Sequence, residues 1–307
     1  MNPTHFFSVS LLDNIEILQE TVPRLNHFYE TPKISIVCPE QELESFNFTF
    51  KQFNNVTLIS EDSIISFKEF CEVTFEIANN LGVEISNKDR LGWYYQQALK
   101  LTYFLKYVKK NERWVMWDAD TIPLVKIELF KDGEAVLYGS ALEYHEPYFQ
   151  TLQKIVETLP NFEYGFTIQF FNSTYEDALF IQSKFNKIKL NIPSVDPGRW
   201  VSTIMIECIL NAHQTLCGSL FSEQECVGVM GIARLWRQQK ILLHLRTDLA
   251  GKLSVAQMRV ASLLGFKHLT YEQYGHLSKR KQPWLTFIYS AAKAIVRQRV
   301  LFGYLGK

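Results

Sequence analysis

One segment of the chain, Trp114–Leu124, joins a strand-like apolar run to two carboxylates. The run ends in Asp118 and Asp120, which stand one residue apart. Residues i and i+2 of a strand share a face, so both carboxylates point the same way if extension continues through Ala119. Such a pair offers oxygen ligands to Mg²⁺ or Mn²⁺, cations that also bind substrate phosphates. We therefore expect a metal and diphosphate site here; the alternative is a strand capped by two solvated aspartates.

The chain before this segment alternates between strand-like and helix-like patterns. Strands are expected at residues 6–10, 33–38 and 56–60, and helices at residues 14–27 and 93–109. This alternation predicts parallel βαβ units. Pro23 lies inside the first expected helix and should bend or shorten it, and Pro123 should end the strand ladder after the aspartates.

Ligands of parallel α/β sheets bind beyond the carboxyl ends of the strands. Ser10 and Pro39 follow the first two strands and are therefore expected near a nucleotide crevice. Gln96, Gln97 and Lys100 lie on the helix that precedes the aspartates, and we expect them to face the nucleotide. The alternative is a solvent-facing polar stripe. The sequence contains neither a GxGxxG fingerprint nor a P-loop, so dinucleotide and P-loop readings have no support.

The downstream chain continues with strands and then with helices. Strands are expected at residues 135–140 and 166–172, helices at residues 175–187 and 200–213, and a terminal helix at residues 284–307. The terminal segment combines an apolar stripe with Lys and Arg, which is typical of a basic amphipathic helix on a membrane surface. The alternative is a helix packed on the protein or on a second subunit.

Composition excludes several classes of protein. The chain has 307 residues, of which 47% are apolar, so it can bury a substantial core. Its 32 basic residues balance 32 acidic ones, which argues against a nucleic acid polymer as partner. The five cysteines form no CxxC pair, so reduced thiols are expected. The sequence begins without a signal-peptide pattern and predicts no transmembrane helix, so we expect a cytoplasmic protein with peripheral membrane contact as an option.

Three segments of the chain resemble segments of known glycosyltransferases. Trp117–Thr121 resembles the metal-binding DxD motif of nucleotide-sugar glycosyltransferases with the GT-A fold. Gly92–Lys100 and Ser222–Gly228 look like segments of a less characterised bacterial group that is often linked to surface polysaccharide. The last segment keeps the acidic pair and the glycine of that group but lacks both of its aromatic positions. The resemblance covers roughly residues 1 to 275.

The resemblance implies a GT-A-like (Rossmann-like) α/β fold, with a mixed, mostly parallel sheet flanked by helices. Residues 1–125 would form the nucleotide-sugar-binding half and residues 126–275 the acceptor half. Residues 276–307 would form a C-terminal, basic amphipathic helical extension. The implied activity is transfer of a sugar from a nucleoside diphosphate sugar, preferably a UDP-sugar, to a glycan or lipid-linked acceptor with Mn²⁺ or Mg²⁺. The oligomeric state stays open, with a homo-oligomer as one option.

Site roles follow from the demands of glycosyl transfer. Asp118 and Asp120 would hold the metal, with Asp120 as the more direct ligand in GT-A enzymes. An inverting reaction, which we prefer to a retaining one, needs a base for the acceptor hydroxyl. Glu223 and Glu225 are the candidates; alternatively they are turn residues or acceptor ligands. His244 resembles the late histidine that some GT-A families add to the metal, although a lone histidine in an apolar run is commonly a core residue.

Two other functions remain open at this stage. Paired carboxylates also serve Mg²⁺-dependent nucleotidyltransferases and phosphoryl-transfer enzymes, although residues 6–12 lack the Gly-rich basic loop of sugar nucleotidyltransferases. A non-catalytic scaffold of a polysaccharide assembly complex is the third option.

Overall fold

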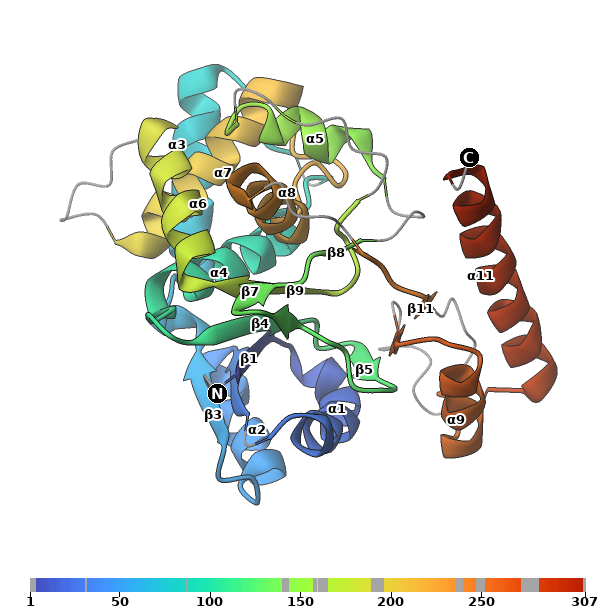
Figure 1. Cartoon of the computed structure of the whole chain (residues 1–307). Coiled ribbons are helices and arrows are strands. Elements are labelled where there is room, and N and C mark those ends of the chain that lie inside the picture. The colour runs from blue at the N-terminus through green and yellow to red at the C-terminus, as the bar shows by residue number, and fades with distance from the viewer. Residues whose placement is uncertain are drawn as a thin grey trace.

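The computed structural model describes residues 4–30, 32–86, 88–139, 144–156, 159, 165–188, 196–235, 240–246, 252–271 and 282–305. A five-stranded sheet crosses the middle of the molecule (Figure 1). Its strand order is β3-β2-β1-β4-β9. The first four strands run parallel, and β9 runs antiparallel to β4. These strands are β1 (Thr4–Val9), β2 (Lys33–Cys38), β3 (Val56–Ser60), β4 (Arg113–Trp117) and β9 (Phe170–Thr174).

Helices cover both faces of this sheet because its strands are apolar on both sides. Phe6 and Phe7 of β1 point to opposite faces and are buried in different core clusters. One face carries α1 (Ile15–Phe28) and α2 (Leu43–Phe50) (Figure 1). The other carries α3 (Phe67–Leu81), α4 (Leu91–Tyr107), α5 (Glu146–Leu152), α6 (Tyr175–Ile188), α7 (Pro197–His213) and α8 (Glu223–Leu235). Short 3-10 turns η1 (Leu12–Asn14), η2 (Glu40–Glu42) and η3 (Glu61–Ser63) follow β1, β2 and β3.

A second, smaller layer is assembled from distant parts of the chain. Its three-stranded sheet has the order β11-β12-β5, formed by β11 (His244–Arg246), β12 (His268–Thr270) and β5 (Thr121–Pro123). Helices α9 (Val255–Leu263) and α11 (Trp284–Leu305) pack beside it (Figure 1). Phe287 and Ala291 of α11 are buried in the same cluster as Ile17 of α1. The remaining strands are short: β6 (Phe130–Lys131), β7 (Glu134–Ala135), β8 (Tyr138–Gly139) and β10 (Lys240–Ile241).

The predicted fold class is confirmed: the chain forms a mixed, mostly parallel sheet flanked by helices, with a C-terminal helix. The expected strands at 33–38 and 56–60 have the observed bounds. Of the two effects predicted for Pro23, a bend or a shorter helix, the shortening is wrong, because α1 continues past Pro23 to Phe28. Helices α2 and α3 were not expected from the sequence. A capping box at Ser66 and Glu69 begins α3, and Gly82, with φ of 68°, ends it.

Two predicted strands differ from the observed ones. The segment 135–140 contains only the short strands β7 and β8, and residue 140 lies outside the described residues. Strand β9 begins at Phe170 instead of residue 166. The backbone N–H groups of residues 166–169 donate to the side chains of Gln224 and Glu225, which replace a partner strand. Within the described part of the chain, we find no helix long and apolar enough to cross a membrane.

Candidate active site

A cavity of about 640 Å³ opens at the carboxyl ends of β1 and β4. Ligands of parallel sheets bind at this edge because loops, and not strands, surround it. The cavity is bounded by the segment after β1, by one side of α4, by the turn after β4 and by the start of α8. Its described lining includes Val9, Leu11, Asp13, Asn14, Arg90, Trp93, Gln96, Gln97, Lys100, Asp118, Ala119, Asp120, Tyr148, Thr167, Gln169, Ser219, Ser222, Glu223, Gln224 and Tyr271.

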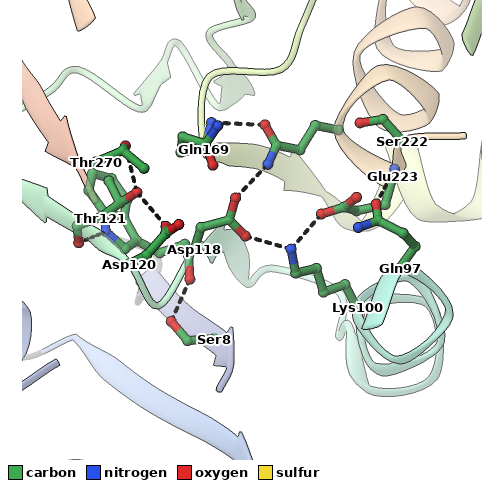
Figure 2. A network of polar contacts seen from close by, with 12 residues as sticks. Ser8, Gln97, Lys100, Asp118, Asp120, Thr121, Gln169, Ser222, Glu223 and Thr270 are labelled. Atoms are coloured by element: carbon green, nitrogen blue, oxygen red, sulfur yellow. Dashed lines mark hydrogen bonds and ion pairs between the residues drawn. The ribbon is translucent and has the colours of Figure 1, made fainter. Parts of the chain in front are cut away.

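Asp118 and Asp120 both line this cavity, but they lie on a turn and not on an extended strand. Strand β4 ends at Trp117, and the N–H of Thr121 donates to the carbonyl of Asp118. The indole N–H of Trp117 also donates to the carbonyl of Thr121, at 2.8 Å. Extension therefore does not continue through Ala119, contrary to the assumption made from sequence. Figure 2 shows the Asp118 carboxylate pointing toward Lys100, with Asp120 beside Thr121.

Lys100 lies between two buried carboxylates (Figure 2). Its Nζ is 2.5 Å from Asp118 Oδ1 and 2.9 Å from Glu223 Oε1. Although burial lowers the pKa of Lys100, the two carboxylates outweigh that effect and raise it, so Lys100 carries a positive charge. Burial raises the pKa of Glu223 above its ordinary value, and the charge of Lys100 opposes that rise. The other oxygen of Asp118 accepts a hydrogen bond from Gln224 Nε2 at 2.8 Å.

The two glutamates at the start of α8 lie in different surroundings. Glu223 lines the cavity, and its backbone N–H donates to Gln97 Oε1. Glu225 is fully buried, and its Oε1 accepts from the N–H groups of Phe166 and Thr167 at 2.7 and 3.2 Å. It is not among the residues that line the cavity. The structure thus brings Glu223 together with Asp118, whereas Glu225 orders the backbone behind the cavity.

His244 is connected to Asp120 through two hydroxyl groups. Its Nε2 lies 2.9 Å from Thr270 Oγ1, which lies 2.9 Å from Thr121 Oγ1. Thr121 Oγ1 in turn donates to Asp120 Oδ1 at 3.1 Å. The ring of His244 also stacks on that of His268, with centroids 4.2 Å apart. The histidine is buried and is not among the described lining residues, and in this arrangement two hydroxyl groups separate it from Asp120.

The remaining predicted residues divide between the cavity and its supports. Gln96 and Gln97 line the cavity, as does Lys100. Ser10 is buried, and its N–H donates to Val37, which joins the ends of β1 and β2. Pro39 follows β2 directly. Neither Ser10 nor Pro39 is among the described lining residues.

Sequence reasoning missed several residues of the cavity. Gln224 binds Asp118 and, through Oε1, the N–H groups of residues 168 and 169. Its position between two glutamates at a helix start was the available signal. Arg90 and Trp93 also line the cavity; Arg90 directly precedes α4, and Trp93 lies in the first turn of this helix, before Gln96. Tyr148 and Tyr271 come from distant segments, and their sequence context gave no sign of the cavity.

The donor set fits a divalent cation that also binds substrate. Mg²⁺ is commonly held by one or two protein carboxylates together with water and phosphate oxygens. Asp118 and Asp120 supply two such carboxylates on one cavity wall. Within the described ranges, no group of three or more His, Cys, Asp or Glu side chains is arranged to hold a metal by itself. The two aspartates therefore suit a cation whose remaining ligands come from a bound diphosphate and water.

Comparison with known families places the chain. A family profile described as "Family of unknown function (DUF6492)" matches residues 8–213. The chain belongs to this family. The match includes the β1 to α7 region and thus Lys100, Asp118 and Asp120, but it ends before Glu223. A comparison with curated protein sequences finds no match.

Three solved structures that resemble the chain are glycosyltransferases by name. Mouse xyloside xylosyltransferase 1 in its apo form is 12% identical, with 88% of this chain and 98% of that chain covered and a TM-score of 0.45. The galactosyltransferase LgtC, in complex with donor and acceptor sugar analogs, is 11% identical, with 94% and 95% covered and a TM-score of 0.43. The apo bifunctional glycosyltransferase WbbM is 11% identical, with 97% and 52% covered and a TM-score of 0.39. These likenesses are too remote to assign an activity.

Proposed function

We propose that the chain is a metal-dependent glycosyltransferase that moves a sugar from a nucleoside diphosphate sugar, preferably a UDP-sugar, to an acceptor hydroxyl. One observation carries the proposal: the cavity at the carboxyl edge of the sheet holds Asp118 and Asp120 on one wall and the Lys100–Glu223 pair next to them. Two carboxylates that suit a cation, a buried glutamate and room for a ligand thus occur together. The cavity volume of about 640 Å³ lies within the range of ordinary small-molecule sites.

Asp118 and Asp120 would hold Mn²⁺ or Mg²⁺ in this proposal. When bound, such a cation supplies Lewis-acid stabilisation of the negative charge that develops on the leaving diphosphate. Asp120 is the more direct ligand, because both oxygens of Asp118 already contact Lys100 and Gln224. Gln96 and Gln97 are proposed to contact the donor from the side of α4. Ser10 and Pro39 are proposed to shape the nucleotide end through the backbone that follows β1 and β2.

Glu223 is the proposed base for the acceptor hydroxyl in an inverting reaction. Glu223 is among the residues that line the cavity, and burial raises its pKa toward the range in which a base accepts a proton effectively. Lys100, at 2.9 Å, favours the ionised form that a base must have. Glu225 is proposed to support this arrangement by fixing residues 166 and 167.

The proposal is tested by calorimetry of UDP and a panel of nucleotide sugars, with Mn²⁺ or with a chelator. Asp120→Asn removes one ligand charge and should abolish the metal-dependent part of UDP binding while the protein stays folded. Asp132→Asn, on an exposed turn away from the cavity, is the matched control and should bind UDP like the parent. Unchanged metal-dependent affinity in Asp120→Asn would refute the metal site.

Product analysis separates the alternative functions. Glycosyl transfer releases a nucleoside diphosphate, whereas a nucleotidyltransferase supplied with a nucleoside triphosphate and a sugar phosphate releases pyrophosphate. Pyrophosphate release would replace our proposal by that alternative. Metal-dependent donor binding without any turnover toward glycan or lipid-linked acceptors would favour a scaffold of a polysaccharide assembly complex.

The C-terminal helix suggests where such an enzyme works. Helix α11 buries Phe287 and Ala291, yet Leu285, Ile288 and Tyr289 are 83%, 55% and 69% exposed. Lys293 and Arg297 are also exposed on this helix. Apolar and cationic groups together suit the surface of an anionic membrane. We propose a peripheral contact of this kind; unchanged flotation of an Ile288→Asp variant with phosphatidylglycerol vesicles would contradict it.

A further inference from the structure

The end of the cavity away from the aspartates has a different chemical character. Arg90 precedes α4, and Trp93 lies in its first turn, whereas Lys100 lies further along the same helix. An α-helix rises about 1.5 Å per residue, so Arg90 and Lys100 are separated by about 15 Å along its axis. All three residues line the same cavity. The cavity therefore has a carboxylate end at Asp118 and an aromatic, cationic end at Arg90.

Two aromatic side chains form a wall at this second end. The rings of Trp93 and Tyr148 are nearly parallel, at 14°, with centroids 6.5 Å apart. The Arg90 guanidinium lies 4.7 Å from the centroid of the Trp93 ring. The wall is held by neighbours: the Tyr94 hydroxyl donates to the Gly218 carbonyl, and His145 contacts both Tyr148 and the Ser219 carbonyl.

No carboxylate in the described part of the chain forms an ion pair with Arg90. The Arg90 guanidinium donates to Ser219 Oγ. The other described cation of the cavity, Lys100, is bound by Asp118 and Glu223. Arginine carries five N–H donors in a planar fork that matches a carboxylate or a phosphate. Apart from the bond to Ser219, the described residues leave donors of Arg90 for a ligand that contacts the aromatic wall.

We propose that Arg90, Trp93 and Tyr148 form an acceptor subsite for a pyranose that carries an anionic group, either a carboxylate or a phosphate. The aromatic wall stacks on the C–H face of the sugar, and Arg90 binds the anion with charge-assisted hydrogen bonds. The inference rests on the proposed function, because the donor diphosphate is taken to lie at Asp118 and Asp120. The backbone positions of Arg90 and Lys100 are about 15 Å apart along the helix axis, so we place the anionic group of the acceptor and the donor diphosphate at opposite ends of the cavity.

The test uses calorimetry or saturation-transfer NMR on the full chain with Mn²⁺ and UDP present. Methyl β-D-glucuronide supplies the carboxylate, glucose 1-phosphate the phosphate, and methyl β-D-glucoside is the neutral probe. At least one anionic probe should bind roughly tenfold more tightly than the glucoside, as charge-assisted hydrogen bonds allow. Arg90→Gln should remove this preference, and Trp93→Leu should weaken both the anionic and the neutral probes.

A second pair of residues supplies a matched control. Lys51 Nζ lies over the Phe48 ring, also at 4.7 Å, on the exposed surface of the α2 region away from the cavity. Lys51→Gln and Phe48→Leu should leave every probe unaffected. Affinity for UDP with Mn²⁺ should also be unchanged in Arg90→Gln and Trp93→Leu.

Each result decides one of the two proposals. Failure of both anionic probes to bind, or equal binding by Arg90→Gln and the parent, would overturn the subsite while leaving metal-dependent UDP binding intact. Weaker binding of UMP to Trp93→Leu would also overturn it, since the wall would then stack on the nucleobase. Conversely, Arg90-dependent binding of the glucuronide by a protein that ignores UDP and every nucleotide sugar of the panel would support the saccharide site and refute the glycosyltransferase proposal.

Discussion

Replacement of Lys100 by Met should destabilise the fold strongly and in a pH-dependent manner. The ammonium of Lys100 lies 2.5 Å from Asp118 and 2.9 Å from Glu223, and the three side chains are 5%, 12% and 2% exposed. Methionine keeps the length of the side chain but removes its charge. Asp118 and Glu223 would then remain buried together without a counter-ion.

The expected loss follows from this burial. Removing one partner of a buried ion pair costs about 3–5 kcal/mol, because an uncompensated charge remains. The loss should be greatest at about pH 8 and smaller at about pH 5.5, since protonation of Glu223 removes one of the two buried charges. The sign follows from the pKa of Glu223, which burial raises and which the charge of Lys100 holds down in the parent. When the pKa of a carboxylate is raised in the folded state, the free energy of unfolding decreases as pH increases toward and through that pKa.

Urea unfolding followed by tryptophan fluorescence at the two pH values measures this effect. Lys33→Met is the matched control, because Lys33 pairs with Glu112 at 3.1 Å but is 58% exposed. It should cost only about 0–1 kcal/mol. If Lys100→Met does not fold, Lys100→Met combined with Glu223→Gln should recover part of the stability. A loss below about 1 kcal/mol, or the same loss at both pH values, would refute the reasoning.

Three further outcomes are expected. Glu223→Gln should retain donor binding and lower turnover roughly 10²–10⁴-fold. The parent should lose activity as pH falls through the pKa of Glu223, which burial raises above 4.5. Parental turnover in the variant would exclude Glu223 as the base. His244→Ala should weaken Mn²⁺-dependent UDP binding by roughly tenfold through Thr270 and Thr121; unchanged affinity in calorimetry would leave His244 a packing role. Phe287→Ala should lower the free energy of unfolding in urea by about 3–5 kcal/mol. Leu285→Ala, at an exposed position, should change it by no more than about 0.5 kcal/mol. Equal losses in the two variants would contradict the packing of α11.

Patterns along the sequence predicted the elements that depend on local periodicity. Strands 33–38 and 56–60 are short segments rich in β-branched residues between turn residues, a local pattern that marks both the inner strand β2 and the edge strand β3. The two short strands β7 and β8 were predicted as one, because an apolar run does not show where its partner strand ends. The start of β9 depends on Gln224 and Glu225, which are more than fifty residues away in the sequence.

The sequence by itself determined the α/β class and the position of two carboxylates after a buried strand. It also marked Gln97, Lys100 and Glu223 as chemically important. Only the tertiary structure decided that Lys100 joins Asp118 to Glu223. The same holds for the different roles of Glu223 and Glu225, one lining the cavity and one binding backbone N–H groups behind it. Contacts between distant segments have no periodicity along the chain, whereas burial of a strand or a helix face does, because the backbone repeats its geometry.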